Sequence, residues 1–550
     1  MNSTSHIALV GSRKAAPAGD KVKDVGATKR LEVSIMLPCA ATDAEIDRVL
    51  AEVTSGKRAP LSVAELTKLL GATADHIREI TDACNAKGLT VMPQTAADQA
   101  HGIVRISGTY ARFRRLFPQL KLSVFKDNGV NIIGREGHIN VERSLPVVGV
   151  YGFDDRDIAS CYFRRPIQGD GKGQFAARRP NLPAGLTSRG LARLQGIPVD
   201  DLSKVTGVVT GYISLGGDNG KKMQADVALA AKHDGIGTAK FVGVSVDGTP
   251  VEGNYNDDAT VENALDAQAH ALMNPNGYVV VFRADNSDDA FARAQETANV
   301  FEGVKEGDKV LPLMGLSISW GMAETNWTEQ SLKRWERAFK AARLRGIIVT
   351  SATGDNGSKD GTDVETGDAP SCVPHNIGAA GVYIRSTDGT TVTEVGVWND
   401  MGAGGGATGG GISTTFPLMD EEKGLNVPVS AATKKPGHSA SLIADCAAPD
   451  SGPQVMYKGR FSQVGGTSHA SPFINIKLCL LQRLLAKPVA DMVGFAYANA
   501  KGMFRQVTVD GNNGAYEAKT TDLYNAAVGF GVIDWTGFLA QAQKVNGVAK

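Results

Sequence analysis

The chain of 550 residues has no excess of charge of one sign, few aromatic residues and no long apolar runs. Lysine plus arginine and aspartate plus glutamate both number 58, so the formal net charge is +0. This balance excludes a whole-chain electrostatic footprint for nucleic acid or an anionic membrane. The apolar runs are far shorter than the ~18 to 20 residues that span a bilayer. We therefore expect neither nucleic acid nor a membrane as a partner.

Cysteine is also scarce: there are six, with no CxxC pair and none beside a histidine at metal-ligand spacing. This argues against a zinc site. Six in 550 is too sparse for a disulfide scaffold, although one or two bridges remain open. The N-terminal stretch has no apolar core of ~7 to 15 residues, so it does not predict a standard secretory signal.

What is present is an ordinary globular composition, 42% apolar and 21% charged. Its periodicity divides the chain into four parts. Residues 1–28 predict a disordered lead-in, and residues 29–157 predict a compact α+β unit. Residues 158–185 are rich in Gly, Pro, Arg and Ala without periodicity, which predicts an exposed linker. Residues 186–550 alternate apolar runs with helical patterns, which predicts a doubly wound α/β domain with a mostly parallel sheet.

Local patterns predict the individual elements. In the α+β unit, a capping box begins a helix at Ser62, and we expect strands over 31–37, 89–92, 103–108 and 121–125 and helices over 43–52, 62–70, 73–87 and 110–116. In the C-terminal domain we expect strands over 205–215, 241–246, 278–282, 313–320 and 346–351, separated by helices over 222–233, 259–272, 290–302 and 329–344. In such sheets the active residues gather at the carboxyl ends of the strands.

The sharpest local signal is the string GGTSHASP at residues 465–472, which precedes an apolar helical run. Small residues let the backbone turn tightly into a helix, so Ser468 would lie at the helix N-terminus. Free N–H groups and the helix dipole there stabilise developing negative charge, as a serine nucleophile requires. A bare GTS string is more often an ordinary cap, but with the proline that follows, this one resembles the nucleophile motif of subtilisin-like peptidases.

A serine nucleophile also needs a base, and the histidines fit that role poorly. His101 lies in the N-terminal unit and His233 at a helix end. His469 adjoins the nucleophile, and neighbours on a helix point about 100° apart. We expect packing or solvent-facing roles for all three.

A carboxylate is the alternative base. Glu262 and Asp266 lie at i and i+4 on one face of a predicted helix, among small and apolar neighbours. A solvated face is the ordinary explanation of such a pair. In a dry site, however, the two charges repel, so one carboxyl would hold a proton and the pair would titrate together.

A third signal is the turn Gly-Asp-Asn-Gly at residues 354–357, which ends a predicted buried strand. Asp355 is explained either as an ordinary turn residue or as a carboxyl that stays protonated and donates to an oxyanion. The second role requires a site that raises its pKa.

Taken in order, these motifs resemble those of the sedolisins, or serine-carboxyl peptidases, most closely the kumamolisin type. The match runs from about residue 31 to residue 548. Each motif alone is weak evidence for a family, but the order of all of them along the chain is specific. The motifs are Glu262 with Asp266, SISWG at 317–321, GDNG at 354–357, VWN at 397–399, TGGG at 408–411 and GGTS at 465–468. In the N-terminal unit, VRISGT at 104–109 and GREG at 134–137 resemble the family's activation prodomain.

The resemblance implies a subtilisin-like catalytic domain preceded by a ferredoxin-like α+β prodomain. It further implies an endopeptidase made as a zymogen and acting on proteins or peptides. Ser468 would be the nucleophile, Glu262 the general base and then acid, and Asp266 the residue that holds and tunes Glu262. Asp355 would donate to the oxyanion together with the Ser468 N–H, and Trp320 would pack near the carboxylates.

The same resemblance predicts acid activity and acid activation. A carboxyl base works near its own pKa and the oxyanion acid must keep its proton, so activity should peak below about pH 5 to 6. The prodomain would be a partner that covers the cleft until acid protonates carboxylates at its interface. Residues 178–180 are a plausible release region. The family works outside the cell or in acidic compartments, and we expect a monomer.

Two departures from the family pattern stand out. Ser214 occupies the place where the family usually carries a glutamate after the first core strand, which would shorten the proton relay behind Asp266. The family also binds calcium near its C-terminus through two aspartates and backbone carbonyls, and Gln506 and Asn525 stand at the aspartate positions, with Val507 beside them. Because Ca²⁺ prefers charged oxygen ligands, we expect no tight calcium, although Asp510 or Asp522 could substitute.

Two alternatives to an active serine-carboxyl peptidase remain open. One is a catalytically impaired sedolisin-like scaffold that binds peptides, suggested by Ser214 and the degraded calcium positions. The other, less favoured, is a histidine-dependent subtilase.

Overall fold

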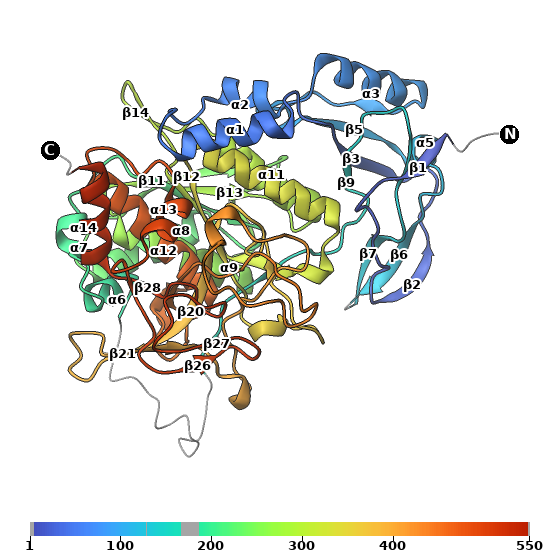
Figure 1. The fold of residues 1–550 in the computed structure, drawn as a ribbon. Coiled ribbons are helices and arrows are strands. Elements are labelled where there is room, and N and C mark those ends of the chain that lie inside the picture. The colour runs from blue at the N-terminus through green and yellow to red at the C-terminus, as the bar shows by residue number, and fades with distance from the viewer. Residues whose placement is uncertain (1–4, 128, 167–185, 548–550) are drawn as a thin grey trace. The chain divides into compact units, whose positions relative to one another are not determined.

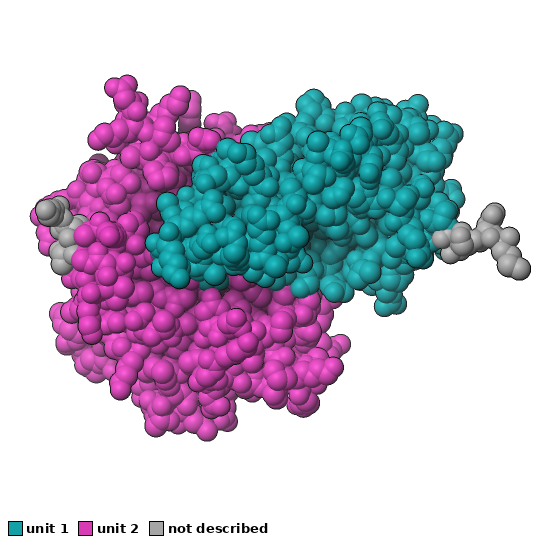
Figure 2. All heavy atoms as spheres, turned by 45° about the horizontal axis from the view of Figure 1, so that its top comes forward, with its two compact units in different colours: residues 1–159, 285–300, 326–345 teal, residues 160–284, 301–325, 346–550 magenta. Residues whose placement is uncertain are grey.

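The structure is a computed structural model that describes residues 5–127, 129–166 and 186–547. It divides into two compact units, coloured separately in Figure 2. Unit 1 comprises residues 1–159, 285–300 and 326–345, and unit 2 comprises residues 160–284, 301–325 and 346–550. Among the described residues, no helix combines the length and the apolar character needed to cross a membrane.

Unit 1 is built on a four-stranded antiparallel sheet with the strand order β4-β5-β3-β9. Helices α3 and α5 pack on its strands, which gives the βαββαβ pattern of a ferredoxin-like unit. The strands are β3 (Arg30–Met36), β4 (Thr90–Val91), β5 (Ile103–Thr109) and β9 (Gly149–Tyr151). The helices are α1 (Asp43–Thr54), α2 (Val63–Leu70), α3 (Ala74–Ala86), α4 (Ala96–His101) and α5 (Tyr110–Leu116). The expected elements are confirmed to within a few residues, including the Ser62 capping box.

The lead-in is where the structure differs from the sequence prediction of disorder. Within its described residues, β1 (His6–Ala8) pairs with β8 (Asn140–Glu142), and β2 (Asp20–Asp24) pairs with β6 (Leu122–Asp127). β6 in turn pairs with β7 (Val130–Arg135). The sequence DKVKD of β2 has no alternation of apolar side chains. Backbone pairing, rather than side-chain burial, therefore holds this strand in place.

Two helices from later in the chain complete unit 1: α10 (Asp288–Asn299) and α11 (Glu329–Arg345). In Figure 1, α11 lies beside α1 and α2, and the aliphatic side chains of these helices share one core. Buried ion pairs reinforce the packing. The Arg293 guanidinium lies 2.6 Å from Asp98, and Arg334 contacts both Glu296 and Asp289.

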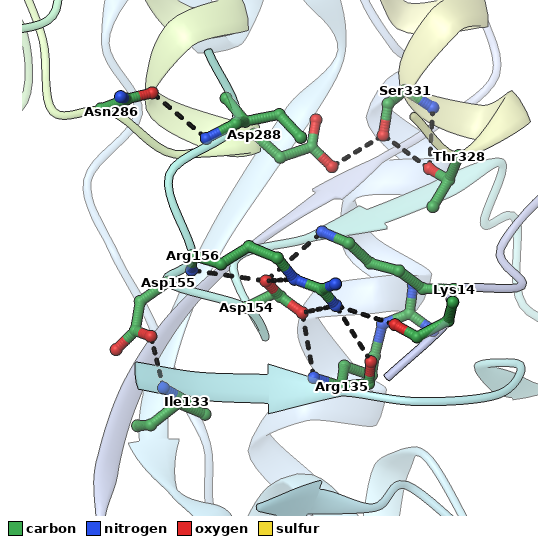
Figure 3. Close-up of polar contacts among 12 residues, drawn as sticks. Lys14, Ile133, Arg135, Asp154, Asp155, Arg156, Asn286, Asp288, Thr328 and Ser331 are labelled. Carbon is green, nitrogen blue, oxygen red and sulfur yellow. Dashed lines mark hydrogen bonds and ion pairs between the residues drawn. The ribbon is translucent and has the colours of Figure 1, made fainter. Parts of the chain in front are cut away.

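Figure 3 shows a second buried charge cluster in unit 1, centred on the Asp154 carboxylate. It receives two 2.6 Å hydrogen bonds from Arg156 and one of 2.9 Å from the Arg135 backbone N–H, and the Lys14 ammonium lies 3.4 Å away. Burial acts to raise the pKa of Asp154, but Arg156 and Lys14 outweigh it and hold the pKa below its usual value. For Lys14, burial dominates and lowers the pKa.

Unit 2 is built on a ten-stranded sheet with the order β12-β13-β11-β16-β18-β20-β22-β28-β25, with β21 paired to β20. All the pairs are parallel except β28–β25 and β20–β21, so the expected mostly parallel sheet is confirmed. Its strands are β11 (Val209–Ser214), β12 (Lys240–Ser245), β13 (Tyr278–Arg283), β16 (Gly315–Ile318), β18 (Ile348–Ala352), β20 (Ile377–Arg385), β21 (Glu394–Val397), β22 (Ile443–Cys446), β25 (Phe504–Arg505) and β28 (Val532–Ile533).

Helices α9 and α12 pack side by side against this sheet and carry the residues singled out from the sequence. Both are buried along nearly their whole length, so no face of either helix is free for solvent. The helices of unit 2 are α6 (Ser188–Leu194), α7 (Val199–Leu202), α8 (Lys221–His233), α9 (Asp258–Met273), α12 (Thr467–Arg483), α13 (Met492–Asn499) and α14 (Trp535–Asn546). The short strands outside the main sheet are β10 (Ser160–Cys161), β14 (Val304–Glu306), β15 (Lys309–Leu311), β17 (Trp320–Ala323), β19 (Asp368–Ala369), β23 (Gln454–Tyr457), β24 (Arg460–Gln463), β26 (Gly511–Asn512) and β27 (Glu517–Ala518).

The Asp154 cluster makes unit 1 sensitive to a single substitution. Asp154→Asn should lower the stability of the full chain at pH 7 by roughly 3 to 5 kcal/mol, because Lys14 would stay buried without its counter-charge. Since the folded pKa of Asp154 is depressed, its contribution is lost as the pH falls through that pKa, and the gap to the parent should narrow below about pH 4. Thermal unfolding across pH measures both effects. Asp155→Asn is the matched control, because Asp155 accepts one backbone N–H, from Ile133; equal losses for the two variants would contradict the assignment.

Candidate active site

Ser468 lies in the first turn of α12, as the sequence predicted. The residue before the helix, Gly466, has φ of +118°, in the region that favours glycine. A β-carbon there would lie only 2.2 Å from the carbonyl oxygen of Tyr162. The backbone N–H of Ser468 has no partner within the helix and donates instead to that carbonyl, at 3.1 Å. The tight turn before α12 thus directs the backbone N–H of Ser468 toward the carbonyl oxygen of Tyr162.

Ser319 links the nucleophile candidate to the carboxylates. Its hydroxyl donates to Asp266 Oδ1 at 2.6 Å and to the carbonyl of Ser468 at 3.2 Å. The Ser468 hydroxyl donates to the Ser319 carbonyl at 3.3 Å. Sequence reasoning placed Ser319 in a family motif without giving it a role, and its hydroxyl is the direct connection between α12 and α9.

Glu262 and Asp266 lie on α9, completely buried, next to these serines. Burial raises the pKa of Glu262 well above its usual value and the charge of Asp266 adds to this, while the hydroxyls of Ser468 and Ser319 act in the opposite direction. Burial likewise raises the pKa of Asp266 against the effect of Ser319. Two carboxyls in one dry site cannot both ionise freely, so they hold a proton to higher pH than isolated acids.

The base is close to the nucleophile without a well-aligned hydrogen bond to it. Within the described residues, neither oxygen of Glu262 has a hydrogen-bond partner. The Ser468 hydroxyl is near enough to lower the pKa of Glu262 but is turned toward the Ser319 carbonyl. A rotation of the Ser468 side chain separates this arrangement from a nucleophile–base pair, and such bonds often tighten only when substrate is bound.

Asp355 follows β18 and faces the start of α12. Its Oδ1 accepts the backbone N–H of Thr467 at 2.8 Å and the Thr467 hydroxyl at 2.9 Å. Burial raises the pKa of Asp355 to about 7, against the Thr467 hydrogen bonds and the Arg164 guanidinium. Among the described residues Oδ2 has no hydrogen-bond partner, and it lies 2.7 Å from where a Gly466 β-carbon would be. The structure therefore brings both Asp355 and the Ser468 N–H to the start of α12.

Trp320 and Ser214 lie near the N-terminal end of α9, the end that also carries Glu262. The Trp320 ring packs near Gly216 and Ala259, so its contribution here is packing. Ser214, at the end of β11, donates to the Gly216 carbonyl at 3.0 Å and accepts from Asn219 at 2.9 Å. Where the family would place a carboxylate, this chain has a neutral hydrogen-bond network.

The histidines lie elsewhere. Both ring nitrogens of His469 are engaged, by the Cys446 carbonyl at 2.7 Å and the Ser188 hydroxyl at 3.2 Å, and burial lowers its pKa to about 4. His101 is part of unit 1, and His233 lies beside Asp234 and Phe461. None of these contacts places an imidazole at the Ser468 hydroxyl, in agreement with the sequence prediction.

A segment that the sequence predicted to be linker also belongs to this site. β10 pairs antiparallel with β17, the Tyr162 N–H donates to the Ser319 carbonyl at 3.3 Å, and Arg164 exchanges two 2.8 Å hydrogen bonds with Gly465. No motif marked this segment, because its contacts are made by the backbone. The release region expected at 178–180 lies outside the described residues.

The residues that match the family's calcium ligands do not fit a calcium site. Ca²⁺ takes carboxylate and carbonyl oxygens, but the Gln506 side-chain N–H₂ donates to the Phe530 carbonyl at 2.9 Å. The Asn525 side-chain oxygen accepts the N–H groups of Ala527 and Val528 at 3.1 and 2.9 Å. The two amides close the loop with hydrogen bonds and bring no negative charge.

The neighbouring candidates do not supply the missing charge in one place. Asp510 accepts the N–H of Thr520 and Asp522 accepts the N–H of Lys519, at 2.8 and 2.9 Å. Val507 is a buried apolar residue. Within the described ranges, no group of three or more His, Cys, Asp or Glu residues is arranged to hold a metal ion.

The sequence is similar to that of a known peptidase along nearly its whole length. No family model matches it. It is 29% identical over 534 residues to kumamolisin of Bacillus sp. (strain MN-32), which covers 94% of this chain and 92% of kumamolisin. It is 26% identical over 237 residues to sedolisin of Pseudomonas sp. (strain 101), which covers 40% of this chain and 38% of sedolisin.

Among solved structures, Pseudomonas sedolisin, a serine-carboxyl proteinase, superposes with a TM-score of 0.55 at 21% identity. This match covers 66% of the present chain and 99% of the sedolisin chain, and it shows the subtilisin-like α/β fold. The sequence likeness extends over nearly the full length of kumamolisin. These likenesses support a kumamolisin-like serine peptidase of the sedolisin family, a hydrolase of proteins or peptides.

Proposed function

We propose that the protein is an acid-acting endopeptidase in which Ser468 is the nucleophile and Glu262 the general base. Asp266 holds and tunes Glu262, and Asp355 donates to the oxyanion. The observation that carries this assignment is the arrangement at the start of α12. The Ser468 N–H donates to the Tyr162 carbonyl, and that carbonyl oxygen and Asp355 Oδ2 lie 2.2 and 2.7 Å from one point, where a Gly466 β-carbon would be.

The reaction follows from this arrangement. The Ser468 hydroxyl turns from the Ser319 carbonyl to Glu262, which takes its proton as the oxygen attacks the substrate carbonyl. The negative charge that develops on the carbonyl oxygen is met by the Ser468 N–H and by a protonated Asp355. Glu262 then gives its proton to the leaving amine, and water hydrolyses the acyl-enzyme by the same route.

The neutral network at Ser214 leaves Asp266 with Ser319 as its hydrogen-bond donor. Proton sharing is thereby confined to Glu262 and Asp266. The alternative of a peptide-binding scaffold without activity predicts that the parent protein hydrolyses nothing at any pH.

We further propose that residues 29–157 of unit 1 are the activation prodomain. Acid would weaken the contacts of this segment with α10 and α11. Ser34 and Arg334 both contact Asp289 on α10, and Asp98 pairs with Arg293. Burial acts to raise the pKa of Asp289, but Arg334 and Arg293 outweigh it and keep it below its usual value. A carboxyl whose pKa is lower in the folded than in the unfolded chain contributes stability at pH values above its unfolded pKa, near 3.9. This contribution is lost as the pH falls through the folded pKa.

The expected monomeric state stays a prediction.

The pH dependence of activity should follow the protonation of Asp355, the acid that donates to the oxyanion. Activity should also require Glu262, which acts as the base. With the pKa of Asp355 near 7, the rate on denatured haemoglobin should be highest below about pH 5 to 6 and fall toward neutrality. Glu262→Gln should lower kcat/KM by about 10² to 10⁴. Glu517→Gln, at an exposed site paired with Lys519, is the matched control. An optimum near pH 8, or an unaffected Glu262→Gln enzyme, would mean that the base is not this carboxyl.

Stability should not depend on calcium. Because amides occupy the positions of the charged ligands, EGTA or millimolar Ca²⁺ should leave the Tm of the parent within about 1 °C, whereas a site filled at ~100 times its Kd would stabilise by ~2.7 kcal/mol. The double variant Gln506→Asp, Asn525→Asp should lower the Tm in EGTA and recover part of it in Ca²⁺. A drop of several degrees when EGTA is added to the parent would contradict the proposal.

A further inference from the structure

We infer that His270 is a positioning residue for the reaction. Its hydrogen bond to Ser317 sets the register of α9 on β16, and its neutral imidazole leaves the negative charge of the carboxyl pair available to the base. The inference rests on the proposed function of the same site and concerns a buried titratable group outside the catalytic set. All the residues that take part belong to unit 2.

Asp266 and His270 lie one turn apart on the same face of α9, as residues four apart on a helix do. Both side chains are completely buried. The Ser319 hydroxyl donates to Asp266 Oδ1 at 2.6 Å, and a second hydrogen bond of 3.0 Å joins Ser317 Oγ to His270 Nε2. Two serines of one strand segment thus meet two ionisable side chains of one helix.

The spacing of these two hydrogen bonds is matched between strand and helix. Residues two apart on an extended strand share a face and are separated by about 6.6 Å, while four residues of an α-helix rise by about 6 Å. Residue numbers rise along α9 as they fall along β16, so the helix runs antiparallel to the strand. A shift of α9 by one turn would break both hydrogen bonds at once. The two bonds together therefore fix the register of the helix on the strand.

Tyr212 of β11 holds the imidazole from a second side. The two rings stack with their centroids 6.5 Å apart and an angle of 10° between their planes. Tyr212 also pairs in register with Ser317 across the β11–β16 ladder. Burial raises the pKa of Tyr212 and the charge of Asp266 adds to this, which places the ring near both helix residues. The Tyr212 hydroxyl donates elsewhere, to Asn219 at 2.7 Å, so the ring orients the imidazole by packing.

The network at Ser214 explains why the carboxyl pair depends on this register. Ser214 bonds along the loop after β11, to the Gly216 carbonyl and the Asn219 amide. Among the described residues, Asp266 Oδ2 has no hydrogen-bond partner, whereas Oδ1 accepts from Ser319. A buried carboxyl with one donor loses much of its stabilisation when that donor moves. The register of α9 on β16 sets the position of this donor.

The second contribution of His270 is its lack of charge. Burial lowers the pKa of His270 to about 3, so the imidazole is neutral while the carboxyl pair carries one negative charge. A positive charge one helical turn from Asp266 in a dry site would draw that negative charge onto Asp266 and leave the proton on Glu262. Glu262 could then not accept the serine proton. The imidazole therefore supports the base when neutral and disables it when protonated.

Within the described ranges, the groups that face the imidazole are Asp266, Tyr212 and Ser317. The other buried ionisable groups on the helices and strands packed against α9 have partners of their own. They are Arg189 of α6, which pairs with Asp200; Asp226 of α8, which accepts the Tyr255 hydroxyl; His469, Lys477 and Cys479 of α12, which contact Cys446, Asp445 and Asn475; and Tyr278 of β13, which donates to Glu306.

The test uses the full chain with substitutions at position 270, assayed on denatured haemoglobin from pH 2.5 to pH 6, with folding checked by circular dichroism at each pH. His270→Gln places a neutral amide at the reach of Nε2 and should keep kcat at pH 5 within about 3-fold of the parent. His270→Leu removes the bond to Ser317 and should lower kcat by about 10- to 100-fold with KM little changed, because the base and the nucleophile are misplaced. His270→Asn, which matches Nδ1 instead of Nε2, should resemble His270→Leu.

The pH profile distinguishes this role from a merely structural one. Protonation of His270 should lower the activity of the parent in strong acid, and His270→Gln cannot take up that proton. With a pKa of about 3, the kcat/KM ratio of His270→Gln to the parent, relative to its value at pH 5, should reach about 2 at pH 3 and about 4 at pH 2.5.

Gln268→Leu is the matched control, since Gln268 is buried on the same helix and bonds the Met456 backbone at 2.8 and 2.9 Å. It should lower the Tm while leaving kcat and the shape of the pH profile as in the parent. Ser317→Ala should reproduce the kcat loss of His270→Leu. The double variant His270→Leu, Ser317→Ala should lose no more than either single variant, because all three remove the same bond.

The outcomes separate this inference from the proposed function. A parent kcat in His270→Leu, or equal kcat losses in His270→Leu and Gln268→Leu, would overturn the positioning role, while an inactive Glu262→Gln enzyme would leave the base in place. A ratio of His270→Gln to parent that stays flat below pH 4 would overturn the role of the charge. A parent that hydrolyses nothing, or a fully active Glu262→Gln enzyme, would overturn both proposals.

Discussion

Removal of water from α9 is the constraint on which the site depends. Glu262 and Asp266 are completely buried on a helix that has no solvent face. In water these carboxyls would ionise near pH 4 and repel each other weakly; in the protein interior they keep protons and share them. Ser319 is then needed, because it is the hydroxyl that satisfies Asp266 while it stays in contact with Ser468. The same exclusion of water gives Asp355 a pKa suited to an acid that donates near neutrality.

Much of the fold and the core of the site follow from the sequence. The strand and helix periods of both units are strong, so β3, α1, α5, β13 and the parallel order of the large sheet were predictable. Ser468, Glu262, Asp266 and Asp355 stand in ordered motifs, and the structure brings them together. The strands of the lead-in were missed, because they are short, bury little side-chain surface and gain their order from backbone pairing with β6 and β8.

The contribution of residues 160–165 was missed for a related reason. This segment is held through its main chain, so its side chains need no periodicity and no motif. Ser319 was present in a family string, but only coordinates show that its hydroxyl reaches across to α9. Gln506 and Asn525 illustrate the opposite case, since the loss of charge was visible in the sequence, while the hydrogen bonds that replace a cation were not.

Unit 1 also constrains the order in which the chain can fold during its synthesis. Its helical core includes Ala341 and Leu344 of α11, and its buried charges at Asp98 are met by Arg293 of α10. These partners lie well over a hundred residues beyond the sheet of unit 1. While the ribosome is still making them, the N-terminal segment exposes apolar helix faces and unpaired charge, and such surface attracts chaperones and favours misassembly. Vectorial synthesis therefore delivers an N-terminal unit that cannot be finished until more than half of the polypeptide has emerged.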